Sequence, residues 1–278
     1  MIPKVIHYCW FGGKPLPKLA RKCIASWKKY CPDYEIIEWN ENNFDVNKCL
    51  FSKEAYREKS WAFLSDVARL FIIWENGGVY LDTDVELISS IDHLLSANDF
   101  FFGIETQSGK NGSKLVRVAT GLGFAASPGN KIIKSLLDEY TEKHFVEYGI
   151  KNTTPCPIVN SRVLEKYGFD GSDKVFRFMG GTIYSSDYFC PKEYKTNITH
   201  FSNNTVSVHH YGESWVTGQT KYWMILYYRY KKKMPDGISH FLASYFSYLL
   251  YYGYFRGHFK LIKKLVVPIW KKLNEKIF

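Results

Sequence analysis

The 278-residue chain lacks a Cys-x-x-Cys pair, and its first residues lack the pattern of a secretory leader. It also lacks internal repeats and low-complexity linkers. Without paired cysteines or a leader, a reduced, cytoplasmic setting is the simplest expectation for its six cysteines. Disorder is excluded by what is present, because 46% of the residues are hydrophobic and 18% are aromatic, enough to build a sizeable core.

Net charge is absent from most of the chain. Residues 1–220 carry 25 Lys or Arg and 25 Asp or Glu, whereas residues 221–278 carry 12 Lys or Arg and 2 Asp or Glu. The whole excess of +10 therefore lies in the last part of the chain, which indicates a local anionic partner and not a globally basic protein. We predict one domain over residues 1–220 and a basic, aromatic, helical tail over residues 221–278.

The order of the apolar segments predicts an α/β fold around a parallel sheet. Strands are expected at residues 5–10, 34–39, 79–81, 100–104, 121–126 and 206–210. Helices are expected at residues 17–30, 53–75 and 131–148, the second ended by Gly77 as a left-handed C-cap. Ligands bind beyond the carboxyl ends of parallel strands, where Trp10 and Asp82-Thr83-Asp84 fall.

Asp82 and Asp84 are two residues apart at the end of an expected strand, so their side chains face the same side. Two unpaired carboxylates repel each other, which favours a divalent cation between them. Oxygen ligands select a hard ion, Mn²⁺ or Mg²⁺. A solvated acidic loop explains the same two residues, but the lead-in Gly77–Leu81 places the pair at a strand end and favours the metal.

Asp66 and Arg69 lie one helical turn apart on the same face of the expected helix 53–75. Spacing alone favours an ordinary intrahelical salt bridge. A polar clamp is the alternative, in which Asp66 accepts hydrogen bonds from sugar hydroxyls and Arg69 donates to hydroxyl or phosphate oxygens.

These motifs together resemble glycosyltransferase family 32, the sugar-binding region containing a DXD motif. The core of the likeness is Ser65-Asp66-x-x-Arg69 followed by Gly77-Gly78-Val79-Tyr80-Leu81-Asp82-x-Asp84. The opening Ile6–Gly13 and the later His209–Trp215 are similar to the two ends of that family's region, so the resemblance spans roughly residues 2–215. The catalytic domain of the large clostridial glucosylating toxins is similar too. The resemblance implies a Rossmann-like GT-A fold for a catalytic domain over residues 1–220 and retention at the anomeric carbon.

The resemblance also implies roles for individual residues. The catalytic residues that it implies are Asp66, Arg69 and Asp82. The implied sugar-nucleotide (donor) contacts are Trp10, Tyr80, Asp82, Ser214 and Trp215, with Trp10 stacked on the base and Trp215 closing over the donor. The implied metal ligands are Asp84 and His209, with Asp82, Glu213 and Ser214 as weaker candidates. From the residues alone, Trp10 is equally explained as a core aromatic. His209 and His210 point opposite ways on a strand, so one of them can face a metal, and we expect it to be His209.

The expected function is a retaining, Mn²⁺- or Mg²⁺-dependent transfer of a hexose from UDP-galactose or UDP-glucose. The expected acceptor is a lipid-linked saccharide in bacterial capsule or lipopolysaccharide synthesis. A toxin-like protein glycosyltransferase is a second hypothesis, disfavoured because no delivery or autoprocessing segment is evident. A nucleic-acid-binding module is a third. The balanced charge of residues 1–220 and the acids at the ligand edge argue against it, so we expect no nucleic acid as partner.

The tail contains sixteen aromatic residues interleaved with lysine and arginine. The segment Gly237–Phe255 has no formal charge but is too polar to be a clear membrane span. In Phe259–Leu273, apolar residues alternate with lysines, which is typical of a helix lying among lipid headgroups. Helices packed on the catalytic domain explain the same pattern. We expect an anionic membrane surface as partner, with the protein peripheral at the inner face of the plasma membrane.

Overall fold

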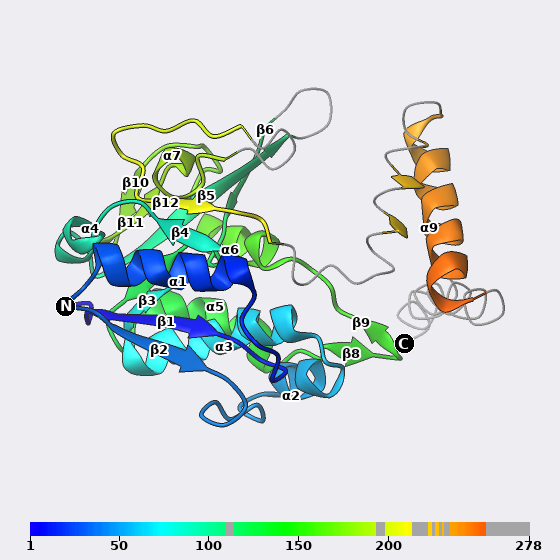
Figure 1. The fold of residues 1–278 in the computed structure, drawn as a ribbon, viewed down its shortest axis with the longest axis horizontal. Helices are drawn as coiled ribbons and strands as arrows, with labels where there is room; N and C mark the ends of the chain where they lie inside the picture. Colours follow the sequence, from blue (N-terminus) through cyan, green and yellow to red (C-terminus); the bar gives the residue numbers. More distant parts are fainter. Residues whose placement is uncertain are drawn as a thin grey trace. The chain divides into compact units, whose positions relative to one another are not determined.

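The structure is a computed structural model that describes residues 1–108, 114–192, 198–212 and 234–253, with Tyr222, Trp223, Leu226, Tyr227 and Tyr230 (Figure 1). The chain divides into two compact units. The first comprises Met1–Phe145 and Asn152–Gly212, and the second comprises Val146–Lys151 and Glu213–Phe278. The assignment of residues 1–220 and 221–278 to separate domains stays a prediction.

The first unit is built on a mixed sheet whose eight described strands have the order β10-β11-β5-β7-β3-β1-β2, with β6 paired to β5. The strands are β1 (Val5–Cys9), β2 (Glu35–Trp39), β3 (Gly78–Tyr80), β5 (Phe100–Ser108), β6 (Lys114–Val118), β7 (Phe124–Ala126), β10 (Phe176–Phe178) and β11 (Gly181–Tyr184). As predicted, β1 runs parallel to β2 and β3. Strand β7 instead runs antiparallel to β3 and β5, which makes the sheet mixed. The α/β class is confirmed.

Helices accompany this sheet in the first unit. They are α1 (Lys18–Tyr30), α2 (Leu50–Arg57), α3 (Trp61–Asn76), α4 (Asp92–Ser96), α5 (Lys131–Thr141), α6 (Cys156–Glu165) and α7 (Ser186–Phe189). Helix α3 contacts β1, β3 and β7 and packs against α2 and α5, while α1 contacts the short strand β4 (Val85–Leu87). Strand β4 pairs antiparallel with β12 (Ser207–His209).

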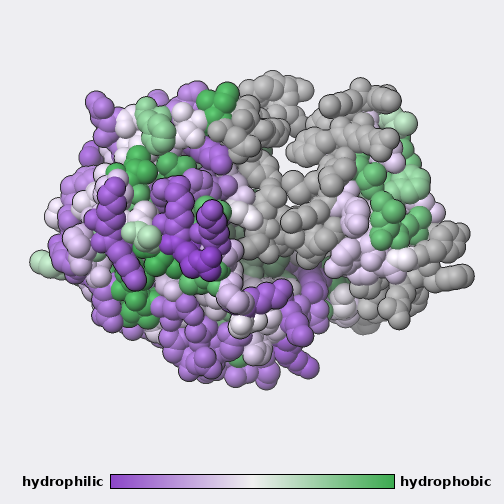
Figure 2. Space-filling view, in the orientation of Figure 1, coloured by the Kyte–Doolittle hydropathy of each residue, from purple (hydrophilic) through white to green (hydrophobic). Residues whose placement is uncertain are grey.

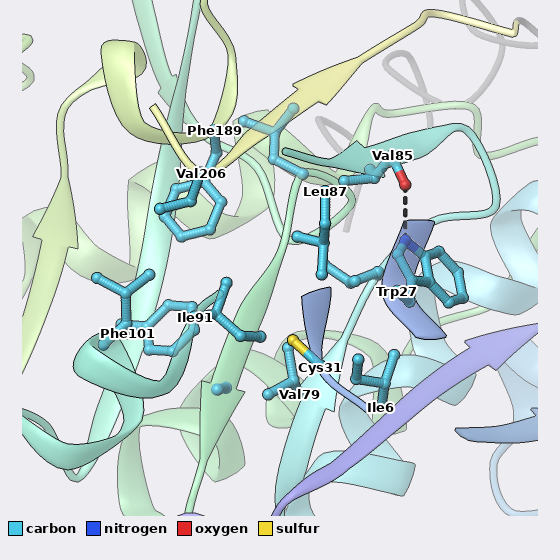
Figure 3. Close-up of a cluster of buried hydrophobic side chains, with 14 of the residues drawn as sticks. Ile6, Trp27, Cys31, Val79, Val85, Leu87, Ile91, Phe101, Phe189 and Val206 are labelled. Carbon is cyan, nitrogen blue, oxygen red and sulfur yellow. Dashed lines mark hydrogen bonds between the residues drawn. The ribbon is translucent and has the colours of Figure 1, made fainter. Parts of the chain in front are cut away.

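A buried apolar cluster joins α1 to the segment that follows the Asp-x-Asp motif (Figure 3). Trp27 of α1 is fully buried among Ile6, Val79 and Leu87. Its indole N–H donates a 2.8 Å hydrogen bond to the carbonyl oxygen of Val85, so the polar group of this large side chain is satisfied. This contact holds β4, and with it the residues just before β4, against α1.

Two predicted helices are shorter than expected. The helix expected at residues 53–75 is two helices, α2 and α3, because Lys59 takes a left-handed conformation (φ 52°) between them. The helix expected at residues 131–148 ends at Thr141. A hairpin of β8 (Val146–Glu147) and β9 (Ile150–Lys151) follows instead, turned by Tyr148 and Gly149 at positive φ.

The second unit contains that hairpin and α9 (Asp236–Tyr252). The fully buried residues of α9 are small: Ser239, Ala243 and Ser247. Large apolar residues of the same helix are exposed, among them Phe241 (59%) and Leu250 (60%). Hydrophobic surface, drawn in green, is visible over α9 at the right of Figure 2. No helix in the described part of the chain is both long and apolar enough to span a membrane. The helix predicted at Phe259–Leu273 lies outside the described residues.

Candidate functional site

The Asp-x-Asp motif directly follows β3 at its carboxyl end, as predicted. The amide of Leu81 donates to the carbonyl oxygen of His7 (3.1 Å), and the amide of Asp82 donates to that of Gly121 (3.2 Å). The amide of Val85 then donates back to the carbonyl oxygen of Asp82 (3.0 Å), which closes a tight turn into β4. The backbone of Asp82 is thus held from two sides before its side chain makes any contact.

The side chain of Arg69 bridges two acids. Its Nη2 lies 2.9 Å from Oδ1 of Asp66 and 3.2 Å from Oδ1 of Asp82. The guanidinium also lies 4.9 Å from the centroid of the Tyr80 ring, and the Tyr80 hydroxyl donates to Oδ1 of Asp82 (3.1 Å). Arg69 is buried, with 4% of its side chain exposed. The intrahelical salt bridge exists, but the same guanidinium also connects α3 to the Asp-x-Asp turn.

Gly121 makes room for the carboxylate of Asp82. A Cβ atom at this position would lie 2.3 Å from Oδ2 of Asp82 and 3.1 Å from Nη1 of Arg69. No side chain can be accommodated there without moving the carboxylate, so the glycine is required by the packing of the acid–arginine group.

Burial sets the protonation tendency of this group. It raises the pKa of Asp82 to about 6, against the opposing effect of Arg69, and the nearby Asp84 raises it further. Burial also raises the pKa of Asp66, again opposed by Arg69. The two carboxylates are therefore poised to gain from any further cation or hydrogen-bond donor that enters the site.

Asp84 has its own partners. The pairing of β12 with β4 places His209 opposite Val85, so its Nε2 lies 3.3 Å from Oδ1 of Asp84. The amide of Gly212 donates to Oδ2 of Asp84 (2.7 Å). Burial alone would raise the pKa of Asp84, but His209 and the Gly212 amide outweigh it and lower the pKa to about 2. The pKa of His209 is raised in return, because Asp84 outweighs burial.

His209 and His210 point to different partners. Nε2 of His210 lies 2.7 Å from Oε2 of Glu86, which also accepts from Nζ of Lys22 at 2.7 Å. Of the two histidines, His209 is the one that contacts Asp84. Its Nδ1 is buried and has no hydrogen-bond partner within the described part of the chain.

Each acid of the motif therefore has a cationic protein partner, Arg69 for Asp82 and His209 for Asp84. Contrary to the expectation from sequence, repulsion between the two carboxylates does not by itself require a metal ion. Within the described residues, no group of three or more His, Cys, Asp or Glu side chains is arranged to hold one. The donor chemistry nevertheless fits Mn²⁺ or Mg²⁺, because both carboxylates keep unused oxygen lone pairs at the strand end.

The remaining predicted residues are placed as follows. Trp10 follows β1, packs partly buried on the apolar cluster, and donates from its indole to the carbonyl oxygen of Lys14 (2.5 Å). Tyr80 is 1% exposed and acts on the site through its hydroxyl bond to Asp82. Glu213, Ser214 and Trp215 lie outside the described residues. The roles of all these residues in binding a sugar nucleotide or a metal stay predictions.

A family model described as "Glycosyltransferase sugar-binding region containing DXD motif" matches residues 17–101, which include Asp66, Arg69, Asp82 and Asp84. The likeness to this sugar-binding region thus covers about a third of the chain. The resemblance inferred from its sequence is confirmed.

Relatives of this sugar-binding region include inositol phosphoceramide mannosyltransferase 1 of Schizosaccharomyces pombe, 24% identical over 180 residues, which cover 60% of this chain and 52% of that one. Subversion of eukaryotic traffic protein A of Legionella pneumophila is 22% identical over 170 residues, covering 51% and 26%. The chain thus spans about half the length of the first and a quarter of the second. A solved glycosyltransferase involved in glycosylating the major capsid of PBCV-1 is 15% identical, covers 77% of this chain and 95% of its own, and has a TM-score of 0.41.

Cys156 is a further residue near the Asp66–Arg69–Asp82 group that sequence reasoning missed. It is the first residue of α6, and burial together with the nearby Asp66 carboxylate raises the pKa of its thiol. A single cysteine ninety residues from Asp66 carries no spacing signal, so only the fold reveals it.

Proposed function

We propose that this chain is a metal-dependent, retaining glycosyltransferase that moves a hexose from a nucleoside-diphosphate sugar to an acceptor hydroxyl. One observation carries the proposal. The Asp66–Arg69–Asp82 group, centred on the buried Arg69, and the Asp84–His209 pair meet at the Asp-x-Asp turn that follows β3, and all of these residues except His209 lie in the segment that matches the sugar-binding model.

The chain's own residues bind and orient the sugar. Asp66 accepts hydrogen bonds from sugar hydroxyls, and Arg69 holds Asp66 and Asp82 in place. Asp84, with Asp82 and His209 as further ligands, would hold Mn²⁺ or Mg²⁺, which when bound neutralises charge on the departing diphosphate. The bond from the anomeric carbon to the diphosphate breaks, and a bond to the acceptor oxygen forms on the same face. The leaving phosphate takes the proton of the acceptor, so no separate base is assigned.

For the sugar nucleotide we propose UDP-galactose or UDP-glucose, with GDP-mannose to be tested beside them because a relative is named as a mannosyltransferase. For the acceptor we propose a lipid-linked saccharide of a bacterial capsule or lipopolysaccharide pathway. The name of the same relative, inositol phosphoceramide mannosyltransferase 1, supports a lipid-borne acceptor.

The test is a thermal-shift panel of UDP-galactose, UDP-glucose and GDP-mannose with Mn²⁺, followed by measurement of nucleoside diphosphate release. Asp84→Ala and Asp82→Ala should abolish release, while Asp33→Ala should not, because the Asp33 side chain is 54% exposed and pairs with Lys4. Release that persists in both site variants would overturn the metal assignment. Absence of any shift with every sugar nucleotide would overturn the function.

We further propose that the chain works at the inner face of the plasma membrane, with its tail on anionic lipid. Two features support this: the net charge of +10 in residues 221–278, and the exposed large apolar residues of α9. The protein should sediment with vesicles containing phosphatidylglycerol more than with neutral ones. Phe241→Ser should weaken sedimentation, whereas Phe201→Ser, an equally exposed phenylalanine (64%) of the first unit, should not. Equal sedimentation by both variants and wild type would contradict this.

A toxin-like transfer to protein is the second candidate, since the name of the Legionella relative refers to subversion of eukaryotic traffic. It predicts sugar incorporation into protein from a eukaryotic cell extract. Incorporation into extracted bacterial lipid instead supports the first candidate.

A further inference from the structure

Helix α3 carries a half-buried tryptophan near each of its ends. Trp61 is its first residue, and Trp74 lies near its last residue, Asn76. Trp61 contacts Gly12, which follows the carboxyl end of β1. The carbonyl oxygen of Trp74 instead accepts from the amide of Gly129 (2.7 Å), which follows the antiparallel strand β7. Trp61 therefore lies at the sheet edge that carries the candidate site, and Trp74 lies at the opposite edge.

The indole of Trp61 supports the turn Trp10–Lys14, which follows β1. A Cβ atom at Gly12 would lie 2.7 Å from Nε1 of Trp61 and 2.8 Å from Cε2, so the backbone of this turn lies directly against the edge of the indole. Gly12 also takes φ 90°, a conformation that glycine adopts without strain. The close contact with Trp61 and the backbone conformation thus both require glycine at this position.

Hydrogen bonds hold the same turn from other sides. The amide of Trp10 donates to the carbonyl oxygen of Trp39 (2.8 Å), and the amide of Gly12 donates to Oε1 of Glu41 (2.8 Å). The indole N–H of Trp10 donates to the carbonyl oxygen of Lys14 (2.5 Å), which closes the turn on itself. The turn is thus attached to β2, to the segment after β2 and, through the Trp61 indole, to α3.

One side of α3 connects Trp61 to the Asp66–Arg69–Asp82 group. The Ser65 hydroxyl donates to the carbonyl oxygen of Trp61 (2.9 Å), and Nε of Arg69 donates to the carbonyl oxygen of Ser65 (3.1 Å). Nη2 of Arg69 then contacts both acids. Trp61, Ser65 and Arg69 follow one another at intervals of four residues, so they lie along one side of the helix, with about 12 Å of helix rise between Trp61 and Arg69.

We propose that Trp61 positions the nucleotide end of the site while the Asp66–Arg69–Asp82 group binds the sugar end, an inference that rests on the proposed function. A nucleoside-diphosphate sugar is elongated, with the base and the sugar at opposite ends, so it needs two binding regions at a fixed separation. Helix α3 provides that separation, because it contacts the turn Trp10–Lys14 through Trp61 and the Asp-x-Asp turn through Arg69. A turn that is already held in place loses little conformational freedom when a ligand binds. Trp61 is thus a positioning residue that acts through this turn.

The experiment separates the two ends of the sugar nucleotide. Calorimetry with Mn²⁺ measures the binding of UDP-galactose, UDP-glucose and GDP-mannose, beside free UDP and GDP, for the wild type and for each variant. Trp61→Ala removes the indole, and Trp61→Phe keeps an aromatic ring but lacks the Nε1 edge that faces Gly12. Asp66→Asn changes the sugar end. Trp74→Ala is the matched control, because it removes a half-buried tryptophan from the far end of the same helix.

Trp61→Ala should weaken the binding of free nucleoside diphosphate and of sugar nucleotide alike, by about tenfold, because the turn must then be ordered by the ligand. Trp61→Phe should lose less. Asp66→Asn should weaken the binding of the sugar nucleotide and leave that of the free diphosphate unchanged, and Trp74→Ala should bind both as the wild type does. Thermal unfolding of each variant shows that it is folded before the titration, and Trp61→Phe decides if Trp61→Ala is not.

Gly12→Ala gives an independent measurement of the same contact. Its methyl group meets the indole, so it should weaken diphosphate binding by a larger factor in the wild type than in Trp61→Ala. Wild-type affinity in the Trp61 variants, a loss confined to the sugar nucleotide, or an equal loss in Trp74→Ala would overturn the inference and leave the proposed function standing. Additive effects of the Gly12 and Trp61 substitutions would do the same. Failure of the wild type to bind any sugar nucleotide would overturn both.

Discussion

Two histidines of the first unit, the buried His7 and the partly buried His209, have opposite charge tendencies because their partners differ. His7 lies inside the sheet, where its Nδ1 accepts from Nε1 of Trp39 (3.0 Å) and its Nε2 donates to the carbonyl oxygen of Gly77 (3.1 Å). His209 lies at the candidate site against Asp84. Burial lowers the pKa of His7 to about 4, whereas Asp84 raises the pKa of His209 in spite of burial. A buried histidine is neutral beside neutral groups and cationic beside an acid, so the partner decides its chemistry.

The same contrast divides the Gly-Gly-x-x-x-Asp-x-Asp motif into two halves, a glycine end (Gly77 and Gly78, with His7 beside them) and an acid end (Asp82 and Asp84, with their partners). Gly77 provides the acceptor for His7, and a Cβ atom at Gly78 would lie 2.9 Å from Nε2 of His7. The glycines thus serve the packing of His7 and the entry into β3. The acids Asp82 and Asp84 serve the site. Damage to one half should appear as lost stability, and damage to the other as lost activity.

The largest effect is expected at the acid end. Asp84→Asn removes the proposed direct metal ligand and the counter-charge of His209, so turnover should fall by about 100-fold or more. Nucleoside diphosphate release measured over a range of Mn²⁺ concentrations checks this. Asp33→Asn, at an exposed acid, is the matched control. Wild-type turnover and metal dependence in Asp84→Asn would remove Asp84 from the site.

Substitutions at the glycine end should lower the free energy of unfolding. Gly78→Ala places a methyl group at φ 94°, 2.8 Å from the carbonyl oxygen of Val5 and close to His7, and should cost about 3 kcal/mol in unfolding free energy. Gly129→Ala has a similar backbone (φ 71°) with nothing within 4 Å, and should cost about 1 kcal/mol. Urea denaturation of both variants measures the difference. Equal costs would show that the space around His7 is not the reason for Gly78.

Much of the glycine end could be predicted from sequence, because it depends on local pattern. Apolar alternation located β1, β2 and β3, and Gly77 ended α3 as a C-cap at φ 67°. The position of the two acids beyond β3 followed from the same pattern. Local pattern did not reveal the left-handed Lys59 that divides α2 from α3, because a lysine at positive φ has no distinctive signature.

The acid end was only partly predictable, because it depends on contacts between distant segments. Arg69 was correctly paired with Asp66, but its second bond to Asp82 needs α3 to pack beside β3. His209 reaches Asp84 only because β12 pairs with β4 across more than a hundred residues. Helix α6, which supplies Cys156, was not predicted at all. The charge balance of the two acids was therefore misjudged from sequence, since their cationic partners were not visible there.

The two ends should also differ in their dependence on pH, measured on metal-free protein. The pKa of His7 is lower in the folded state than the ordinary 6.5, so its contribution to stability is complete above pH 6.5 and is lost as pH falls toward 4, by up to about 3 kcal/mol. The pKa of Asp82 is raised from 3.8 to about 6, so Asp82 lowers stability as pH rises through the same range. In the wild type these two effects oppose each other.

Asp82→Asn should therefore uncover the contribution of His7. Its urea midpoint should fall more steeply between pH 6.5 and 4.5 than that of the wild type. His7→Gln in the same background should flatten the curve again. If Asp82→Asn kept the wild-type profile, the raised pKa of Asp82 would be wrong.

The smallest effect is expected at His210, which tests the comparison within two adjacent residues. Its partner Glu86 keeps Lys22 when the ring is removed, and the His210 side chain is already 23% exposed. His210→Gln should therefore cost about 0.5 to 1 kcal/mol in stability and leave sugar-nucleotide affinity unchanged. His209→Gln should reduce that affinity, because Asp84 loses its cationic partner and any metal loses a nearby ligand. Equal affinity losses in the two variants would mean that His209 and His210 contribute alike to sugar-nucleotide binding, although their side chains point to opposite sides of the chain at the end of β12.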